Sequence, residues 1–202
     1  SPVRNRSGWA MNVARAAASL GADVTAVALL AGHAGRWIAD ALAGEGIAAR
    51  LAWCDGETRS CIAIHDAHDD SLTELNEAGP SVDPAAWERL VGALRAELLA
   101  GSVGAVGLVT VSGSLPPGAP SDGIAQLVAV SRAAGVPIGV DCSGEALRRA
   151  LLERPTLVKL NLAEAEATIS RARTDRAAGT DRTSGSNGDE ARAVALAREL
   201  TE

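Results

Sequence analysis

Side chains suited to metal and phosphate binding follow two apolar runs in the second half of the sequence. Asp141 ends the run VPIGVD, Lys159 lies in the run TLVKL, and Asn161 and Glu164 come directly after it. A carboxylate at a strand end can serve a metal ion, and a Lys can meet a phosphate as a point charge. An Asn and a Glu three residues apart can share the water shell of Mg²⁺. Structural interpretations stay open, because Asp141 can cap a helix and the Asn–Glu pair can form a capping box.

A third polar segment, SGSLPPG at residues 112–118, directly follows the apolar run GLVTVS. Its two glycines, two serines and Pro-Pro pair predict a rigid turn with exposed amides and hydroxyls. The turn lies at the carboxyl end of a predicted strand, where the ligands of open α/β sheets bind. Ser114 is therefore a candidate ligand-binding residue, although a structural loop can hold both serines by chance.

Two motifs in the first half of the sequence could also bind an anion. The segment SGWAMN, which contains Gly8 and Asn12, is a small-residue loop that leads into a helix, so its amides could approach a ligand closely. Arg59 ends the segment GETR, and its planar fork can donate two parallel hydrogen bonds to a phosphate. Helix capping explains the first motif equally simply, and a solvated turn explains the second.

The elements that must position these residues alternate between strand and helix patterns. The sequence predicts strands at 23–30, in GLVTVS, in VPIGVD and in TLVKL, with helices at 12–20, 35–43, 123–134, 145–153 and 163–169. Asp83-Pro84 predicts an N-cap and a first helical proline for a helix that reaches about Leu99. Buried, non-alternating strands between helices are typical of a mostly parallel sheet covered on both faces. We therefore expect an α/β fold.

Three segments depart from this alternation. Residues 51–77 contain two short alternating runs around a polar turn, which predicts a β-hairpin lid. Residues 171–189 contain no large apolar side chain and should form a disordered linker or loop, and residues 190–202 return to helical spacing. Because the sequence starts without Met and its last helix has no following strand, we expect residues 1–170 to be an incomplete domain.

Composition and charge exclude several classes of protein. The net charge of −6 provides no basic surplus for phosphates, so we expect no nucleic-acid partner. The longest uncharged run, which includes residues 98–118, is broken by Gly and Pro, and we expect no membrane span. Three cysteines without a Cys-x-x-Cys pattern favour a reduced, cytoplasmic setting and make a zinc site improbable.

Taken together, these motifs resemble one kinase family. From about residue 7 to 169 the chain resembles the phosphofructokinase-B-type branch of the ribokinase-like carbohydrate kinases, nearest to 1-phosphofructokinase and tagatose-6-phosphate kinase. The resemblance rests on the segments SGWAMNVARA, GETR, TELNEAGP, SGSLPPG, DCSGEAL and KLNLAEAE. SGSLPPG and DCSGEAL are the most specific of these. The resemblance implies a ribokinase-like sheet with a small hairpin lid.

The resemblance also implies roles for individual residues. Gly8, Asn12, Arg59 and Ser114 match positions that bind the sugar phosphate. Lys159, Asn161 and Glu164 match positions that serve ATP, and Glu164 with Asp141 match positions near Mg²⁺. The implied activity is ATP-dependent phosphorylation of a phosphosugar hydroxyl, and the lid implies a homodimer.

Departures from the family pattern support an alternative. Trp9 and Ala10 crowd a loop that is glycine-rich in relatives, and the family's Gly-Ala-Gly-Asp motif, which carries the catalytic Asp, is absent from these 202 residues. We therefore expect the isolated chain to be inactive. The alternative function is a non-catalytic fragment or pseudoenzyme that at most binds a sugar phosphate or a partner. A Rossmann nucleotide-binding module is disfavoured, because no G-x-G-x-x-G follows a first strand.

Overall fold

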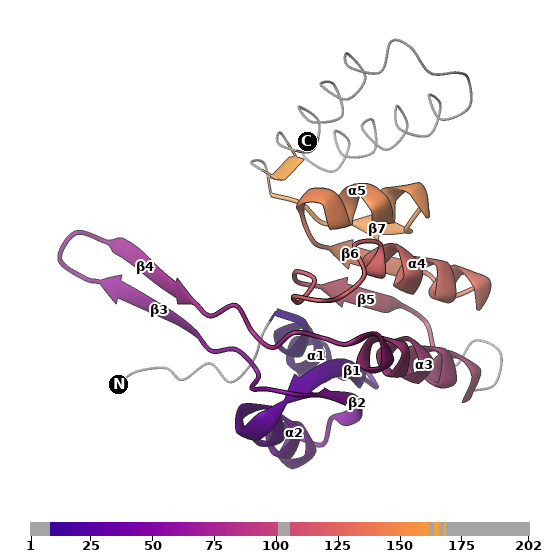
Figure 1. Ribbon diagram of the computed structural model, residues 1–202, viewed down its shortest axis with the longest axis horizontal. Helices are drawn as coiled ribbons and strands as arrows, with labels where there is room; N and C mark the ends of the chain where they lie inside the picture. Colours follow the sequence, from indigo (N-terminus) through magenta and orange to yellow (C-terminus); the bar gives the residue numbers. More distant parts are fainter. Residues whose placement is uncertain (1–8, 101–105, 162–163, 166–167, 169–202) are drawn as a thin grey trace, which may run out of the picture. The chain divides into compact units, whose positions relative to one another are not determined.

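The computed structural model describes residues 9–100, 106–161, 164–165 and 168 (Figure 1). The chain divides into two compact units, which are described separately. Unit 1 contains Ser1–Ala93 and Pro116–Pro120, and unit 2 contains Leu94–Leu115 and Ser121–Glu202. None of the helices in the described part of the chain is long and apolar enough to cross a membrane.

Unit 1 is built around two parallel strands. Its elements are α1 (Trp9–Ser19), β1 (Thr25–Ala31), α2 (Gly32–Gly44) and β2 (Ala48–Cys54). The strands pair in parallel from Thr25 opposite Ala48 to Ala31 opposite Cys54. Helix α2 packs against both strands and α1 packs against β1. The apolar faces of these elements form one core, with Met11, Ala14, Ala26, Leu30, Ile38, Leu42 and Ile47 buried in it.

The predicted lid is an antiparallel hairpin of β3 (Cys61–Asp66) and β4 (Ser71–Asn76). It is shorter than the predicted segment 51–77, because residues 51–54 lie in β2 and pair with β1. In β2, Leu51 and Ala52 are partly or fully buried beside β1, so they are not available to the lid. All twelve residues of the hairpin strands are exposed.

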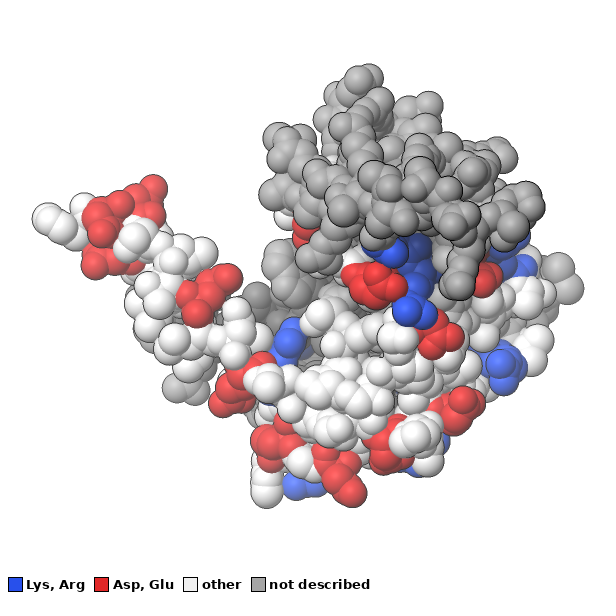
Figure 2. Space-filling model, turned by 45° about the horizontal axis from the view of Figure 1, so that its top comes forward, with Lys and Arg blue, Asp and Glu red and all other residues white. Residues whose placement is uncertain are grey.

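The hairpin carries only negative formal charge. Asp66, Asp69, Asp70 and Glu74 lie within residues 61–76, which contain no Lys or Arg. Figure 2 shows acidic side chains and no basic ones on this extension. Its turn is closed by local hydrogen bonds from the N–H of His68 to Asp66 and from the N–H of Ser71 to Asp69.

Helix α3 (Pro84–Ala100) begins where the sequence predicts it. The Asp83 carboxylate accepts a hydrogen bond from the N–H of Ala86 at 2.7 Å, which caps the helix, and Pro84 occupies the first helical position. Trp87 and Leu90 on this helix are buried. The cap and the proline thus explain the local start of α3.

Unit 2 contains a three-stranded parallel sheet, in the order β5-β6-β7. Its elements are β5 (Val109–Ser112), α4 (Gly123–Ala133), β6 (Ile138–Asp141), α5 (Gly144–Leu152) and β7 (Leu157–Val158). The core consists of Ile124, Val128, Ile138, Val140, Cys142, Leu147, Ala150 and Val158. These parallel strands and covering helices confirm the predicted α/β class.

Three sequence predictions concern segments that the structure describes only in part or not at all. Of the helix predicted at 163–169, the described residues Glu164, Ala165 and Thr168 are helical. The linker predicted at 171–189 and the helix predicted at 190–202 lie outside the described residues.

Candidate functional site

The carboxyl edge of the sheet in unit 2 brings two of the predicted residues together. Asp141 is the last residue of β6, and Lys159 directly follows β7, the neighbouring parallel strand. The Nζ atom of Lys159 lies 3.0 Å from Oδ2 of Asp141. The side chains are 68% and 26% exposed, respectively, so the ion pair faces solvent. A cation and a carboxylate therefore stand side by side where a ligand can reach both.

The end of β5 contributes to the same edge. The N–H of Gly113 donates to the carbonyl oxygen of Asp141 at 2.9 Å, which ties the start of SGSLPPG to the end of β6. Gly113 has a φ of +109°, a backbone conformation that residues with a Cβ rarely adopt. The next residue, Ser114, is exposed. The glycine thus turns the chain at the strand end and leaves the Ser114 hydroxyl in solvent.

Asn161 and Glu164 form a reciprocal capping box. The N–H of Glu164 donates to Oδ1 of Asn161 and the N–H of Asn161 donates to Oε2 of Glu164, both at 2.9 Å. This is the structural interpretation that the sequence left open. Among the described residues Oε1 of Glu164 makes no hydrogen bond, so one carboxylate oxygen remains available.

The surroundings of Cys142 show that the carboxyl edge of this sheet carries negative charge. Burial and, to a smaller extent, the carboxylates of Asp141 and Glu164 raise the pKa of the Cys142 thiol to about 12. Two carboxylates therefore lie near one buried thiol, with Lys159 as a partial counter-charge. No group of three or more His, Cys, Asp or Glu in the described ranges is arranged to hold a metal ion by itself.

The predicted residues of unit 1 lie on a helix and a loop. Asn12 is partly buried on α1, and Gly8 lies outside the described residues. Arg59 is exposed in the loop between β2 and β3. Within the part of the chain that the structure describes, its guanidinium makes no ion pair or hydrogen bond. This arginine is consequently available to an anion.

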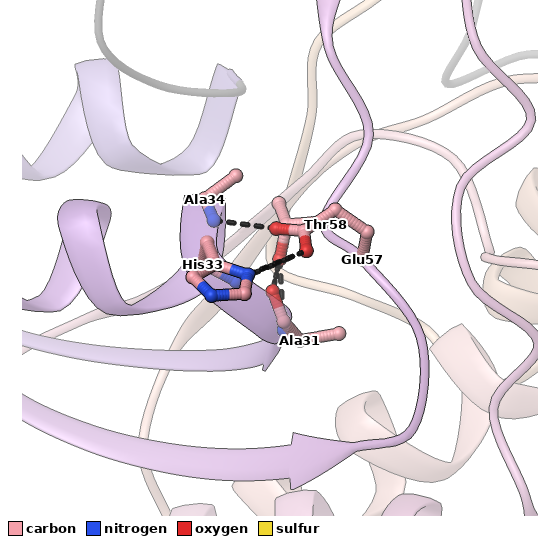
Figure 3. A network of polar contacts seen from close by, with 5 residues as sticks. All are labelled: Ala31, His33, Ala34, Glu57 and Thr58. Atoms are coloured by element: carbon pink, nitrogen blue, oxygen red, sulfur yellow. Dashed lines mark hydrogen bonds and ion pairs between the residues drawn. The ribbon is translucent and has the colours of Figure 1, made fainter.

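Beside Arg59 the structure reveals a polar network that the sequence interpretation missed (Figure 3). The carboxylate of Glu57 accepts hydrogen bonds from the N–H groups of His33, at 3.0 Å, and Ala34, in the first turn of α2. The pKa of Glu57 is lowered below its ordinary value, chiefly by the hydrogen bond from the N–H of Ala34 and next by the one from the N–H of His33. The sequence signal that could have indicated this network is the start of α2, because its N-cap residue, Ala31, has no side chain that could accept hydrogen bonds from the first N–H groups of the helix.

The sequence-predicted residues thus divide between the two units. Asn12 and Arg59 belong to unit 1, and the others belong to unit 2: Ser114, Asp141, Lys159, Asn161 and Glu164. Asp141 with Lys159, and Asn161 with Glu164, are in direct contact.

Comparisons with known proteins agree on one family. A model described as "pfkB family carbohydrate kinase" matches residues 2–199. A possible 1-phosphofructokinase from Thermotoga maritima is similar over 76% of this chain and 48% of its own, with 27% identity and a TM-score of 0.69.

Two structures of phosphofructokinase-2 from Escherichia coli are also similar. The complex with fructose-6-phosphate shares 27% identity over 93% of this chain and 56% of its own, with a TM-score of 0.70. The tetrameric inhibited form shares 26% identity over 91% of this chain and 55% of its own, with a TM-score of 0.68. The present chain thus spans about half the length of these solved structures.

Proposed function

Because this chain belongs to the pfkB family of carbohydrate kinases, we propose that it is part of an enzyme that phosphorylates a hydroxyl of a phosphosugar with ATP. The observation that carries the proposal is the family match, which extends over residues 2–199. The similar Escherichia coli enzyme in complex with fructose-6-phosphate supports a hexose phosphate as the substrate class. Such a reaction needs a positioned acceptor hydroxyl, a base for its proton and positive groups for the phosphoryl charge.

We assign the sugar phosphate to Gly8, Asn12, Arg59 and Ser114. The guanidinium of Arg59, which is unpaired among the described residues, is suited to the phosphate, because its fork can donate two hydrogen bonds at once. The exposed hydroxyl of Ser114 can donate a further bond. Both groups bind and orient the substrate and neither moves a proton.

We assign ATP binding to Lys159, Asn161 and Glu164, and Mg²⁺ to Glu164 with Asp141. The residues fit that ion, because Mg²⁺ usually keeps several waters and binds one or two carboxylates together with substrate phosphates. Asp141 is partly exposed and Glu164 keeps one free oxygen among the described residues, so both can accept hydrogen bonds from metal-bound water. When bound, Mg²⁺ neutralises charge on the phosphates.

The catalytic base is not among the residues assigned above. The sequence of 202 residues contains no Gly-Ala-Gly-Asp, so we propose that this chain binds substrate without supplying the catalytic Asp. The same absence favours the second candidate function, a non-catalytic protein that binds a sugar phosphate. Both candidates predict binding and no turnover by the chain on its own.

We further propose a homodimer through the hairpin. Residues directly opposite in an antiparallel pair share a face, so Ile62, Ile64 and Leu75 lie on one side of β3 and β4 with Thr73. An isolated two-stranded hairpin is marginally stable in water, and its exposed apolar face would be covered in a dimer. A cytoplasmic location is part of this proposal and is supported by the three free cysteines.

A coupled assay of ADP release tests the catalytic part of the proposal. The purified chain is mixed with MgATP and fructose 6-phosphate, fructose 1-phosphate or tagatose 6-phosphate. We expect no turnover above the rate without sugar. Turnover within the range of about 1–100 s⁻¹ that is typical of kinases would show that another group in these 202 residues acts as the base.

A further inference from the structure

We propose that Glu57, Thr58 and Glu77 are positioning residues that hold Arg59 in place and keep its guanidinium free for a phosphate. The inference rests on the proposed function, in which Arg59 binds the phosphate of the sugar. It adds a role for three side chains that do not themselves reach the ligand. All the contacts that carry it lie within unit 1.

The first anchor precedes Arg59 and ties the loop to the junction of β1 and α2. The Thr58 hydroxyl accepts from the N–H of Ala31 at 2.8 Å and donates to its carbonyl oxygen at 3.0 Å. The N–H of Thr58 also donates to that carbonyl at 3.0 Å. Together with the bonds from Glu57 to the first turn of α2, five hydrogen bonds hold two consecutive residues (Figure 3).

A glycine makes this first anchor sterically feasible. Gly32 has a φ of +60°, and a Cβ at this position would collide with the Glu57 carboxylate and lie 2.7 Å from the carbonyl oxygen of Gly56. The backbone at the end of β1 therefore approaches the loop more closely than any other residue type would allow. The close approach brings the carboxylate within reach of the helix N–H groups.

The second anchor follows Arg59 and ties the loop to the segment after β4. The N–H of Ser60 donates to Oε2 of Glu77 at 2.7 Å, and the N–H of Glu77 donates to the carbonyl oxygen of Ser60 at 3.2 Å. The stem of Arg59 runs beside Gly79, where an added Cβ would lie 3.4–3.8 Å from its carbons. The backbone of Arg59 is thus fixed on both sides, and its stem has a defined path.

Within the part of the chain that the structure describes, the same contacts keep Arg59 unpaired. Glu57 and Glu77 are the acidic residues closest to it along these two segments, and either would be a natural ion-pair partner. Both carboxylates are instead engaged by backbone N–H groups, Glu57 at the positive end of α2. An arginine that is held in place and left without a counter-charge is prepared for an anionic ligand. Loss of either carboxylate's hydrogen bonds should therefore weaken phosphate binding through Arg59.

Titration of fructose 6-phosphate with the full 202-residue chain, followed by ³¹P NMR, tests this role. We expect Glu57→Gln and Thr58→Val each to raise the dissociation constant about fivefold or more, the size of a coupling between neighbouring residues. Thr58→Ser, which keeps the hydroxyl, should restore the parent affinity. Glu77→Gln serves as a second test of the carboxylates if Glu57→Gln does not fold.

Two controls separate positioning from stability. Asp83→Ala removes a cap from another helix start in the same unit, at α3, and should leave the affinity unchanged while it lowers the melting temperature. In an Arg59→Lys background, which keeps the positive charge and removes the fork, Glu57→Gln should raise the dissociation constant by a smaller factor than in the parent, because its action passes through the arginine.

The outcomes distinguish this inference from the proposed function. If the parent chain does not bind fructose 6-phosphate, the proposed function and the inference both fail. If the parent binds, Arg59→Ala abolishes binding, and the folded Glu57, Thr58 and Glu77 variants bind as the parent does, only the positioning role is refuted. An equal loss of affinity in Asp83→Ala would also refute it, because general destabilisation would explain the effect.

Discussion

Replacement of Ile64 by Thr should weaken the proposed dimer about 30-fold, whereas replacement of Leu72 by Thr should not. Ile64 shares a face of the hairpin with Ile62 and Leu75. Leu72 lies opposite His65, on the other face. Thr favours strands, so both substitutions should preserve the hairpin. The two variants therefore differ in which face loses apolar surface.

The magnitude follows from how much surface remains to be covered. Ile62, Ile64 and Leu75 are 54%, 51% and 54% exposed. Full burial of such a side chain contributes about 1.5–3 kcal/mol, so covering the remaining half contributes about 1 kcal/mol. A two-fold interface contains each residue twice, so one substitution removes about 2 kcal/mol, which corresponds to about 30-fold in the dissociation constant.

Sedimentation velocity over a series of protein concentrations measures this constant for the parent and both variants. Leu72 is a matched control, because it is 60% exposed and loses the same kind of surface. A parent chain that remains monomeric at the highest concentration would refute the dimer. Equal weakening by both substitutions would refute the assignment of the interface to the face with Ile64.

Further predictions concern three residues of unit 2. Leu147→Ala, which empties a fully buried core position, should lower the free energy of unfolding in urea by about 2–5 kcal/mol, and a smaller loss would contradict the core assignment. Cys142, whose pKa is raised from 9.0 to about 12 chiefly by burial, should resist alkylation in the native chain while exposed Cys61 reacts, as mass spectrometry of the labelled peptides would show. Because the unfolded thiol ionises more readily than the buried one, this group's contribution to stability should be lost as the pH rises from 9.0 towards 12. Lys159→Ala should weaken MgATP binding in calorimetry yet change the unfolding free energy by less than about 1 kcal/mol, since its ion pair is largely exposed; unchanged MgATP binding would remove Lys159 from the nucleotide site.

The sequence predicted the elements of the fold best where local signals agree. The β-branched residues of β5 (VTVS) and β6 (IGVD) are typical of strands in a parallel sheet, and Asp83 with Pro84 marks the start of α3. The alternating runs SCIAIHD and LTELNE also predicted the two strands of the hairpin, which the structure forms as β3 and β4. Residues 51–54, the first of the predicted lid segment, instead belong to β2, and this depends on its pairing with β1, which is distant in the sequence.

The candidate site was predictable in its residue types and less so in its contacts. The spacing of Asn161 and Glu164 fits both a capping box and a metal site, and the structure shows that the first is formed. The network of Glu57 joins residues 23 and 24 positions apart in the sequence, so no local pattern indicates it. The contact of Asp141 with Lys159 depends on β6 and β7 being neighbours in one sheet.

Binding of fructose 6-phosphate by Arg59 is the most direct test of the proposed function. In a ³¹P NMR titration we expect the parent chain to bind with a dissociation constant of about 1 mM, worth about 4 kcal/mol. Arg59→Ala should abolish binding, whereas Arg95→Ala, which changes an exposed arginine of α3, should preserve it. No binding by the parent chain, or equal binding by the two variants, would contradict the assignment of a sugar-phosphate site to Arg59.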